Sequence, residues 1–230
     1  MKKFAVIVAG GSGKRMNSQI PKQFLLLGGK PMLMRTLEAF HNYDEALELV
    51  LVLPENQLDY WLELCEQHHF NVPHHLAFGG QQRYDSVKSG LLMVQQLRGP
   101  ESGKALVAVH DAVRPFVDKA LLERCYAQAA ISGAAIPVHA LVESIRRLTD
   151  DGQSLAEDRT AFRLVQTPQV FDADALWSAY QSGYQETFTD DASVMEAARH
   201  RVSLVEGSRR NIKITTPDDL AIASLWLSQE

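Results

Sequence analysis

The chain has little cysteine and no hydrophobic run long enough to span a bilayer. Its two cysteines, Cys65 and Cys125, lie in segments of helical periodicity and belong to no metal-type cluster. We therefore expect no disulfide framework and a reducing cytoplasm as the location. The apolar run from Phe4 to Gly10 is about half a membrane span long and lacks a small-residue cleavage site, so we interpret it as a buried first strand.

Positive charge is also scarce. The 23 lysines and arginines stand against 28 aspartates and glutamates, a formal net charge of −5, which disfavours generic binding to nucleic acid. Neither nucleic acid nor a membrane is therefore expected as a partner. A polyphosphate ligand would require positive charge to be concentrated locally. The 230 residues suffice for one α/β domain covering residues 1–230, and not for two.

Short apolar runs alternate with longer segments of helical periodicity. Strands are expected at residues 4–9, 47–53, 72–78, 105–109, 134–138 and 202–205, and helices at 31–40, 57–68, 84–97, 119–132, 173–185, 190–200 and from 217 onward. This alternation predicts an α/β fold, with a Rossmann-like, mostly parallel sheet covered by helices on both faces. Ligands of such sheets bind beyond the carboxyl ends of the strands, where a glycine loop, Gly79–Gly80 and His110–Asp111 are all expected.

Residues 141–164 break this rhythm. Apolar and polar residues alternate there around Asp150-Asp-Gly152, a signal for a hairpin turn. Two interpretations stay open for this segment. It is either a solvent-exposed excursion, or a projecting β-arm over residues 139–165 that packs on a second copy of the chain.

A glycine-rich loop follows the first strand and leads into positive charge. A Walker loop needs Ser or Thr after Gly13-Lys14, but Arg15 stands there; the dinucleotide fingerprint needs a third glycine, but Met16 takes its place. Both loops are excluded, and with them an NAD-dependent dehydrogenase. Lys14, Arg15 and the later Lys22 would repel one another unless an anion lies among them. The alternative is a solvated basic turn without a ligand.

Further motifs follow this loop in order along the chain. They are Ala9-Gly-Gly-x-Gly-x-Arg-Met16, Pro21-Lys-Gln-Phe24, Gly79-Gly-x-x-Arg-x-Asp-Ser-Val87, His110-Asp-Ala-Val-Arg-Pro115, Gln166-Thr-Pro-Gln169, Thr189-Asp-Asp-Ala192 and Asn211-Ile-Lys-Ile-Thr-Thr-Pro217. Over essentially its whole length the chain resembles the 2-C-methyl-D-erythritol 4-phosphate cytidylyltransferases of the nucleotidyltransferase superfamily. The resemblance implies transfer of a cytidylyl group from CTP to methylerythritol phosphate, with release of pyrophosphate, in non-mevalonate isoprenoid biosynthesis.

The resemblance also implies a role for each matching residue. The catalytic residues that would contact the triphosphate are Arg15, Lys22 and Lys213. The nucleotide-binding positions are Ala9, Gly10, Gly11, Gly13, Gly79, Gly80, Asp85 and Ser86. The acceptor-binding positions are Ser144, Arg159, Thr167 and Thr189, with Arg159 contributed across subunits of a homodimer. Asp111 would hold Mg²⁺, or another divalent cation, against the α-phosphate.

Plainer interpretations remain for several of these residues. Asp85 is alternatively only the N-cap of the helix that follows, Lys213 an exposed lysine on an edge strand, and Asp111 an aspartate neutralised by Arg114. Ser144 stands where the family commonly has threonine, after Glu143 in place of aspartate. We expect His110 to be structural, because a phosphate monoester is already nucleophilic and needs no general base.

Two other functions compete with this hypothesis. Ribitol-5-phosphate cytidylyltransferase shares most of the motifs, although Thr189-Asp-Asp-Ala-Ser193 favours the methylerythritol enzyme. A non-catalytic nucleotide sensor on the same fold belongs to a different class. The joint presence of Arg15, Lys22, Asp111 and Lys213 argues against it, because a sensor needs no metal and cations around the α-phosphate.

Overall fold

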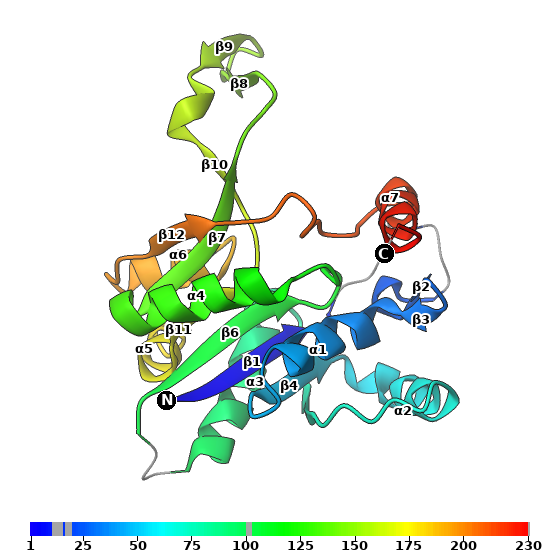
Figure 1. The fold of residues 1–230 in the computed structure, drawn as a ribbon. Coiled ribbons are helices and arrows are strands. Elements are labelled where there is room, and N and C mark those ends of the chain that lie inside the picture. The colour runs from blue at the N-terminus through cyan, green and yellow to red at the C-terminus, as the bar shows by residue number, and fades with distance from the viewer. Residues whose placement is uncertain (11–15, 17–19, 100–102, 230) are drawn as a thin grey trace.

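The computed structural model describes residues 1–10, 16, 20–99 and 103–229. Gly11, Gly13 and Arg15 of the glycine loop lie outside this range. An eight-stranded sheet crosses the described part in the order β10-β7-β11-β6-β1-β4-β5, with β12 also paired to β7 (Figure 1). Its strands are β1 (Lys2–Val8), β4 (Glu48–Leu53), β5 (His75–Phe78), β6 (Ala105–Asp111), β7 (Ala134–Ala140), β10 (Arg163–Val165), β11 (Gln169–Asp172) and β12 (Ser203–Glu206).

The sheet is mostly parallel and has helices on both faces, as the sequence predicts. β1 pairs in parallel with β4 and β6, β4 with β5, and β7 with β12, while β10 and β11 run antiparallel to their neighbours. The helices are α1 (Met32–Tyr43), α2 (Leu58–Gln67), α3 (Arg83–Arg98), α4 (Lys119–Ser132), α5 (Ala173–Ala179), α6 (Asp191–Ala197) and α7 (Pro217–Leu227).

Alternate residues of β1 belong to two separate cores. Ala5 and Ile7 pack in the core that contains α1, α2 and α4, and Phe4 and Val6 pack in the core with α3, α5 and α6. Successive side chains of a strand point to opposite faces of its sheet, so a strand covered on both sides must be apolar throughout. This double burial makes β1 apolar from Phe4 to Val8 and places the end of the strand, just before Ala9 and Gly10, at a fixed position in the molecule.

The structure differs from the expected elements in several places; the strand expected from residue 72 begins at His75, and the helix expected to residue 200 ends at Ala197. β11 was not predicted; its four residues insert antiparallel between β6 and β7, and so short a run carries no period of its own. The helix expected over 173–185 ends at Ala179. His110 and Asp111 do not follow β6 but are its last two residues, because their pairing with Ile7 and Val8 of β1 extends the strand.

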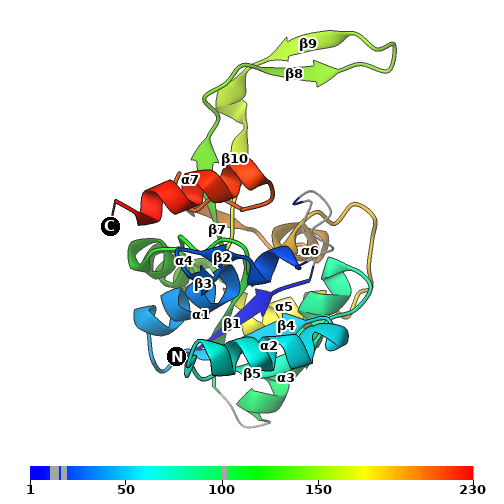
Figure 2. The ribbon, with the colours of Figure 1, turned by 90° about the vertical axis from the view of Figure 1, so that its right-hand side faces the viewer.

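The segment that breaks the rhythm forms a hairpin that projects from the molecule (Figures 1 and 2). β8 (Ile145–Leu148) pairs antiparallel with β9 (Ser154–Glu157), and the turn between them contains Gly152 at a φ of +79°, a conformation that favours glycine. Leu148 at its tip is 80% exposed, and Leu155 and Phe162 are exposed as well. The predicted hairpin is therefore confirmed, while packing on a second copy stays a prediction. Within the described residues, no helix has the length and apolar character needed to cross a membrane.

His74 gives the fold a pH dependence that can be measured. Its Nδ1 lies 2.8 Å from the carbonyl of Val72, and its Nε2 accepts the indole N–H of buried Trp61 at 3.1 Å. Burial lowers the pKa of His74, so the unfolded chain binds a proton near pH 6.5 that the folded protein does not. Stability is therefore expected to fall as the pH drops below about 6.5. His74→Gln should lose less of its free energy of unfolding between pH 7.5 and 5.5 than the parent protein, measured by urea titration; identical losses would contradict this assignment.

Candidate active site

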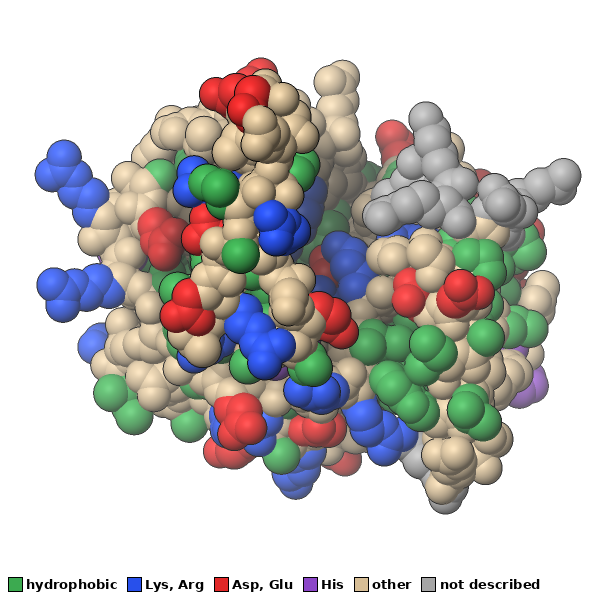
Figure 3. Space-filling view, turned by 90° about the horizontal axis from the view of Figure 1, so that it is seen from above, with side chains coloured by type: hydrophobic (Ala, Val, Ile, Leu, Met, Phe, Trp, Pro, Cys, Tyr) green, Lys and Arg blue, Asp and Glu red, His purple; other side chains and the backbone are tan. Residues whose placement is uncertain are grey.

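A cavity of about 80 Å³ opens at the carboxyl edge of the sheet, beyond the ends of β1 and β6. It is lined by Val8, Ala9, Gly10, Lys22, Gln23, Arg83, Asp111, Ala112, Val113 and Lys213. Lys22 and Lys213 come from near opposite ends of the chain, and Asp111 comes from its middle. On the face that carries the arm, basic and acidic side chains are visible side by side in a hollow (Figure 3). The fold thus gathers several of the predicted site residues around one small space.

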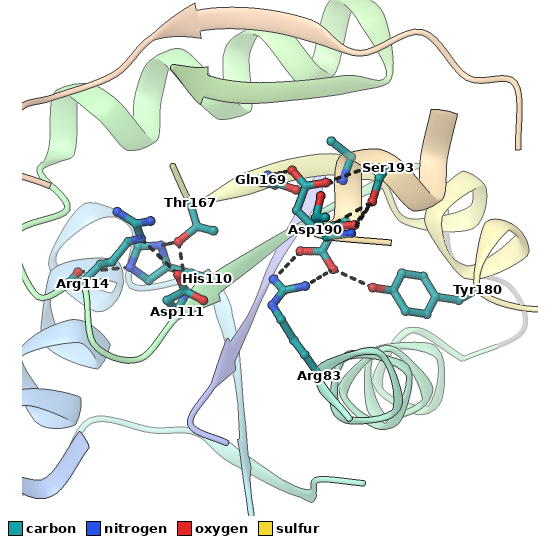
Figure 4. Close-up of polar contacts among 12 residues, drawn as sticks. Arg83, His110, Asp111, Arg114, Thr167, Gln169, Tyr180, Asp190 and Ser193 are labelled. Atoms are coloured by element: carbon teal, nitrogen blue, oxygen red, sulfur yellow. Dashed lines mark hydrogen bonds and ion pairs between the residues drawn. The ribbon is translucent and has the colours of Figure 1, made fainter. Parts of the chain in front are cut away.

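Asp111 is buried at the end of β6 and is surrounded by positive charge. Its Oδ2 lies 3.1 Å from Lys213 Nζ and 3.1 Å from Arg114 Nε (Figure 4 shows Arg114). Burial alone would raise the pKa of Asp111, but the charges of Lys213, Arg114 and Arg83 outweigh it and hold the pKa well below its usual range. The carboxylate is therefore ionised at neutral pH, and Lys213 is an ion-pair partner rather than an isolated surface lysine.

His110 and Thr167 form a hydrogen-bonded pair behind Asp111 (Figure 4). His110 Nε2 donates to the carbonyl of Arg114 at 3.2 Å, so in the neutral ring Nδ1 accepts a hydrogen bond from the hydroxyl of Thr167 at 3.0 Å. Thr167 Oγ1 accepts in turn the backbone N–H of Asp111 at 3.1 Å. Full burial lowers the pKa of His110 to about 4, so the ring is neutral at pH 7. In this arrangement, the buried Thr167 hydroxyl holds the backbone beneath Asp111.

The Gly79–Gly80 loop is fixed by side chains from the first turn of α3. Ser86 Oγ accepts the N–H of Gly80 at 3.2 Å and donates to the carbonyl of Gln82 at 3.1 Å. Asp85 is the third residue of α3 and accepts the N–H of Gln82, the residue that caps the helix. The alternative that Asp85 is only the N-cap of this helix is therefore wrong: Gln82 is the N-cap, and Asp85 is the third residue of a capping box. Its side chain remains exposed.

Gly80→Ala tests how closely this loop must approach α3. A methyl group at position 80 would lie 2.3 Å from Cβ of Asp85, so the loop or the helix end must shift. Misplacement by a fraction of an ångström to 1 Å should raise the KM for a nucleotide bound there by about tenfold or more. Gly103→Ala is the matched control, since a Cβ there meets nothing within 4 Å. The measurement is the nucleotide KM from steady-state kinetics. Equal values in the two variants would contradict a role for the close approach of the Gly79–Gly80 loop to α3.

Gln23 and Arg83 line the cavity but do not stand among the predicted catalytic or binding residues. Gln23 is buried beside Lys22, and its Nε2 donates to the carbonyl of Ala9 at 2.9 Å and to Gln57 at 2.7 Å, tying the short helix η2 (Lys22–Phe24) to the end of β1. Arg83 lines the cavity and pairs with Asp191. Both lie inside the quoted motifs, which is the sequence signal that pointed to them.

Other predicted residues lie away from the cavity. Ser144 and Arg159 belong to the projecting hairpin segment and are exposed, and Arg159 donates to the carbonyl of Val142 within that segment. Exposed Thr189 lines a neighbouring pocket of about 280 Å³, which shares Arg83 with the cavity. Whether Arg159 completes the site of a second subunit stays a prediction.

The cavity offers one carboxylate to a metal. Among the described residues, no three His, Cys, Asp or Glu side chains form a group that could hold a metal ion, so the protein alone supplies no cage. Asp111 uses only Oδ2 in its contacts with the described side chains, which leaves Oδ1 for a cation. Mg²⁺ usually takes one or two carboxylates and fills its remaining positions with phosphate oxygens and water. The donor set therefore fits Mg²⁺ shared with a bound polyphosphate.

A mostly parallel sheet with lysines and one carboxylate around a cavity at its carboxyl edge is the arrangement of an α/β nucleotide-binding protein. The model of one family within this class, "IspD: 2-C-methyl-D-erythritol 4-phosphate cytidylyltransferase", matches residues 4–229. The chain belongs to this family.

Individual relatives agree along the whole length. A protein named 2-C-methyl-D-erythritol 4-phosphate cytidylyltransferase from Bacteroides fragilis is 53% identical over 223 residues, covering 97% of this chain and 98% of that protein. A protein of the same name from Bacteroides thetaiotaomicron is 53% identical over 227 residues, covering 99% of this chain and 100% of that protein. Among solved structures, the 4-diphosphocytidyl-2C-methyl-D-erythritol synthase of Anaerococcus prevotii superimposes with a TM-score of 0.82 at 27% identity, covering 99% and 98%. The Thermus thermophilus cytidylyltransferase gives 0.76 at 31% identity, covering 99% and 100%.

Proposed function

We propose that this protein transfers the cytidylyl group of CTP to 2-C-methyl-D-erythritol 4-phosphate. The products are pyrophosphate and 4-diphosphocytidyl-2-C-methyl-D-erythritol, an intermediate of non-mevalonate isoprenoid biosynthesis. Membership of the family supports the reaction. The structural observation that carries the proposal is the cavity on which Lys22, Asp111 and Lys213 meet beside Ala9 and Gly10.

The reaction requires neutralisation of the phosphate charges more than it requires proton transfer. A phosphate oxygen of the acceptor attacks the α-phosphorus of CTP and forms the new P–O bond. The bond to the bridging oxygen breaks, and its electron pair leaves with pyrophosphate. Lys22 and Lys213, with Arg15 from the glycine loop, bind the triphosphate and stabilise the negative charge of the transition state. The neutral, buried His110 fits this scheme, which assigns no proton to it.

Asp111 serves as the protein's carboxylate for the metal. Mg²⁺, when bound there and to the nucleotide, neutralises phosphate charge and polarises the α-phosphate. Arg114 and Lys213 hold Oδ2 and keep the carboxylate ionised, and Thr167 holds its backbone. These contacts fix the direction in which the remaining oxygen faces.

The remaining roles divide between the nucleotide and the acceptor. Gly79, Gly80, Asp85 and Ser86 bind cytosine and ribose. Ser86 also accepts the N–H of Gly80, and Asp85 accepts the N–H of Gln82. The acceptor-binding positions are Ser144, Thr167, Thr189 and Arg159 of a neighbouring subunit. The projecting arm and the exposed Leu148, Leu155 and Phe162 support a homodimer. Two free cysteines support action in the cytoplasm, where CTP is made.

Pyrophosphate release from CTP tests the proposal. Purified protein should release pyrophosphate with methylerythritol phosphate and Mg²⁺, and release should stop when the metal is chelated. D-ribitol 5-phosphate is the competing acceptor, and turnover of that compound alone would overturn the choice of substrate. Binding of CTP without turnover of either acceptor would point to a nucleotide sensor instead.

A further inference from the structure

Arg83 and Asp191 form a two-point ion pair beside the cavity, although they are 108 positions apart (Figure 4 labels Arg83 and Tyr180). Arg83 Nη1 lies 3.0 Å from Oδ1 of Asp191, and Nη2 lies 2.6 Å from Oδ2. The hydroxyl of buried Tyr180 donates to Oδ1 at 2.6 Å. Asp191 itself is fully buried. A bidentate pair of this kind fixes both the distance and the relative orientation of the segments that carry it.

The two segments belong to different halves of the site. Arg83 is the first residue of α3 and follows the Gly79–Gly80 loop, while Asp191 is the first residue of α6 and follows Thr189. Arg83 lines both the cavity with Lys22 and Lys213 and the pocket with Thr189. The pair therefore bridges the nucleotide loop and the segment assigned to the acceptor.

The start of α6 has a second attachment that does not involve Arg83. Gln169 Nε2 donates to Asp190 Oδ2 at 2.8 Å, and Gln169 Oε1 accepts the N–H of Ala192 at 2.9 Å. Asp190 also caps α6 by accepting the N–H of Ser193 at 2.9 Å. Gln169 thus attaches the start of α6 to the sheet without the ion pair. The contribution of the ion pair is therefore to hold the start of α6 in position relative to α3.

We propose that the Arg83–Asp191 pair, oriented by Tyr180, positions the Thr189 segment against the nucleotide loop so that the acceptor phosphate meets the α-phosphate of CTP. The inference rests on the proposed function and assigns Arg83 and Asp191 a positioning role. Arg83 also adds its charge to those that keep Asp111 ionised. Loss of the pair is expected to affect use of the acceptor more than binding of CTP, because the Gly79–Gly80 loop is held separately by Ser86.

The same helix carries a matched control. Arg98, the last residue of α3, forms a second bidentate pair with Asp174 of α5, with N–O distances of 2.5 and 3.0 Å. This pair joins the opposite end of α3 to its neighbour and lines neither the cavity nor the Thr189 pocket. Asp174→Asn therefore removes an ion pair of the same geometry without touching the site, although Asp174 is more exposed than Asp191.

The test compares Asp191→Asn, Tyr180→Phe and Asp174→Asn with the parent protein. Steady-state kinetics give kcat and the KM for each substrate, calorimetry gives the affinity for CTP without acceptor, and thermal unfolding reports the fold. Asp191→Asn should lower kcat/KM for methylerythritol phosphate about 30-fold and change CTP affinity less than about threefold. Tyr180→Phe should lower kcat/KM for methylerythritol phosphate about fivefold, with a smaller change in CTP affinity. Asp174→Asn should change neither quantity by more than about twofold.

Two results would overturn the inference alone. One is unchanged acceptor kinetics in both Asp191→Asn and Tyr180→Phe; the other is an equal loss for CTP and acceptor, which would show that the pair supports the whole site and does not position the acceptor segment. If Asp191→Asn does not fold, Tyr180→Phe decides the matter, since it keeps the charges and removes one hydrogen bond. Failure of the parent protein to turn over methylerythritol phosphate would overturn the proposed function and the inference together.

Discussion

Lys213→Ala should lower kcat about a thousandfold while the protein stays folded. The ammonium group lines the cavity, lies 3.1 Å from Asp111 Oδ2 and belongs to a side chain that is 42% exposed, so it can reach a ligand from the solvent side. Removing one preorganised charge or donor at a developing negative charge typically costs a factor of a hundred to a thousand. Because Arg114 still pairs with Asp111, the fold loses little.

The measurement is pyrophosphate release from CTP, together with thermal unfolding of each variant. Lys104→Ala is the control, since Lys104 is an exposed lysine directly before β6, at the edge of the sheet opposite to the cavity. It should retain full activity. Turnover of Lys213→Ala within a few-fold of the parent would contradict the assigned chemistry, and a collapse of its melting temperature would show that Lys213 serves the fold instead.

Mixing two inactive variants should restore activity if Arg159 acts across subunits. Arg159→Ala should lose most turnover because the acceptor phosphate loses a bidentate partner, and Lys213→Ala is inactive for the reason given above. A mixed dimer holds one complete site, built from the intact Lys213 of one subunit and the intact Arg159 of the other. Random exchange makes half of the dimers mixed, so an equal mixture should recover about a quarter of the parent activity.

The control for this experiment is each variant mixed with itself under the same exchange conditions. No recovery, with exchange of subunits verified by mass, would show that Arg159 serves its own chain or serves none. Arg159 is exposed and belongs to the arm, which is the reason to look for its function outside its own subunit.

The elements predicted well from the sequence are those whose local signals agree with their surroundings. α4 has the expected bounds because Asp118 caps its start, accepting from Leu121 at 2.7 Å, and Gly133 ends it at a φ of +81°. β1 is apolar from Phe4 to Val8 because both its faces are buried there. β11 was missed because its identity as a strand depends on β6 and β7, which supply both its neighbours.

The site residues also differ in how far local sequence signals predict their positions. Residues that directly follow strands, such as Gly10 and Gly79, are placed by the rule that parallel strands end at one edge. Lys213 follows no such rule: only its motif predicted a place at the site, and its ion pair with Asp111 was not predicted. The pairing of Arg83 with Asp191 is a contact between two helix starts far apart in the chain, which no periodicity or spacing encodes. A single sequence therefore suggests the groups at the site but not the contacts that orient them.

A crystal structure of the protein with CTP and Mg²⁺ is the most direct test of whether Lys22, Lys213 and Asp111 surround the bound nucleotide. Lys22 Nζ and Lys213 Nζ should lie within about 3 Å of triphosphate oxygens, with Asp111 on the metal and the cytosine beside Gly79–Gly80. A nucleotide bound elsewhere, or both lysines turned away from its phosphates, would contradict this arrangement.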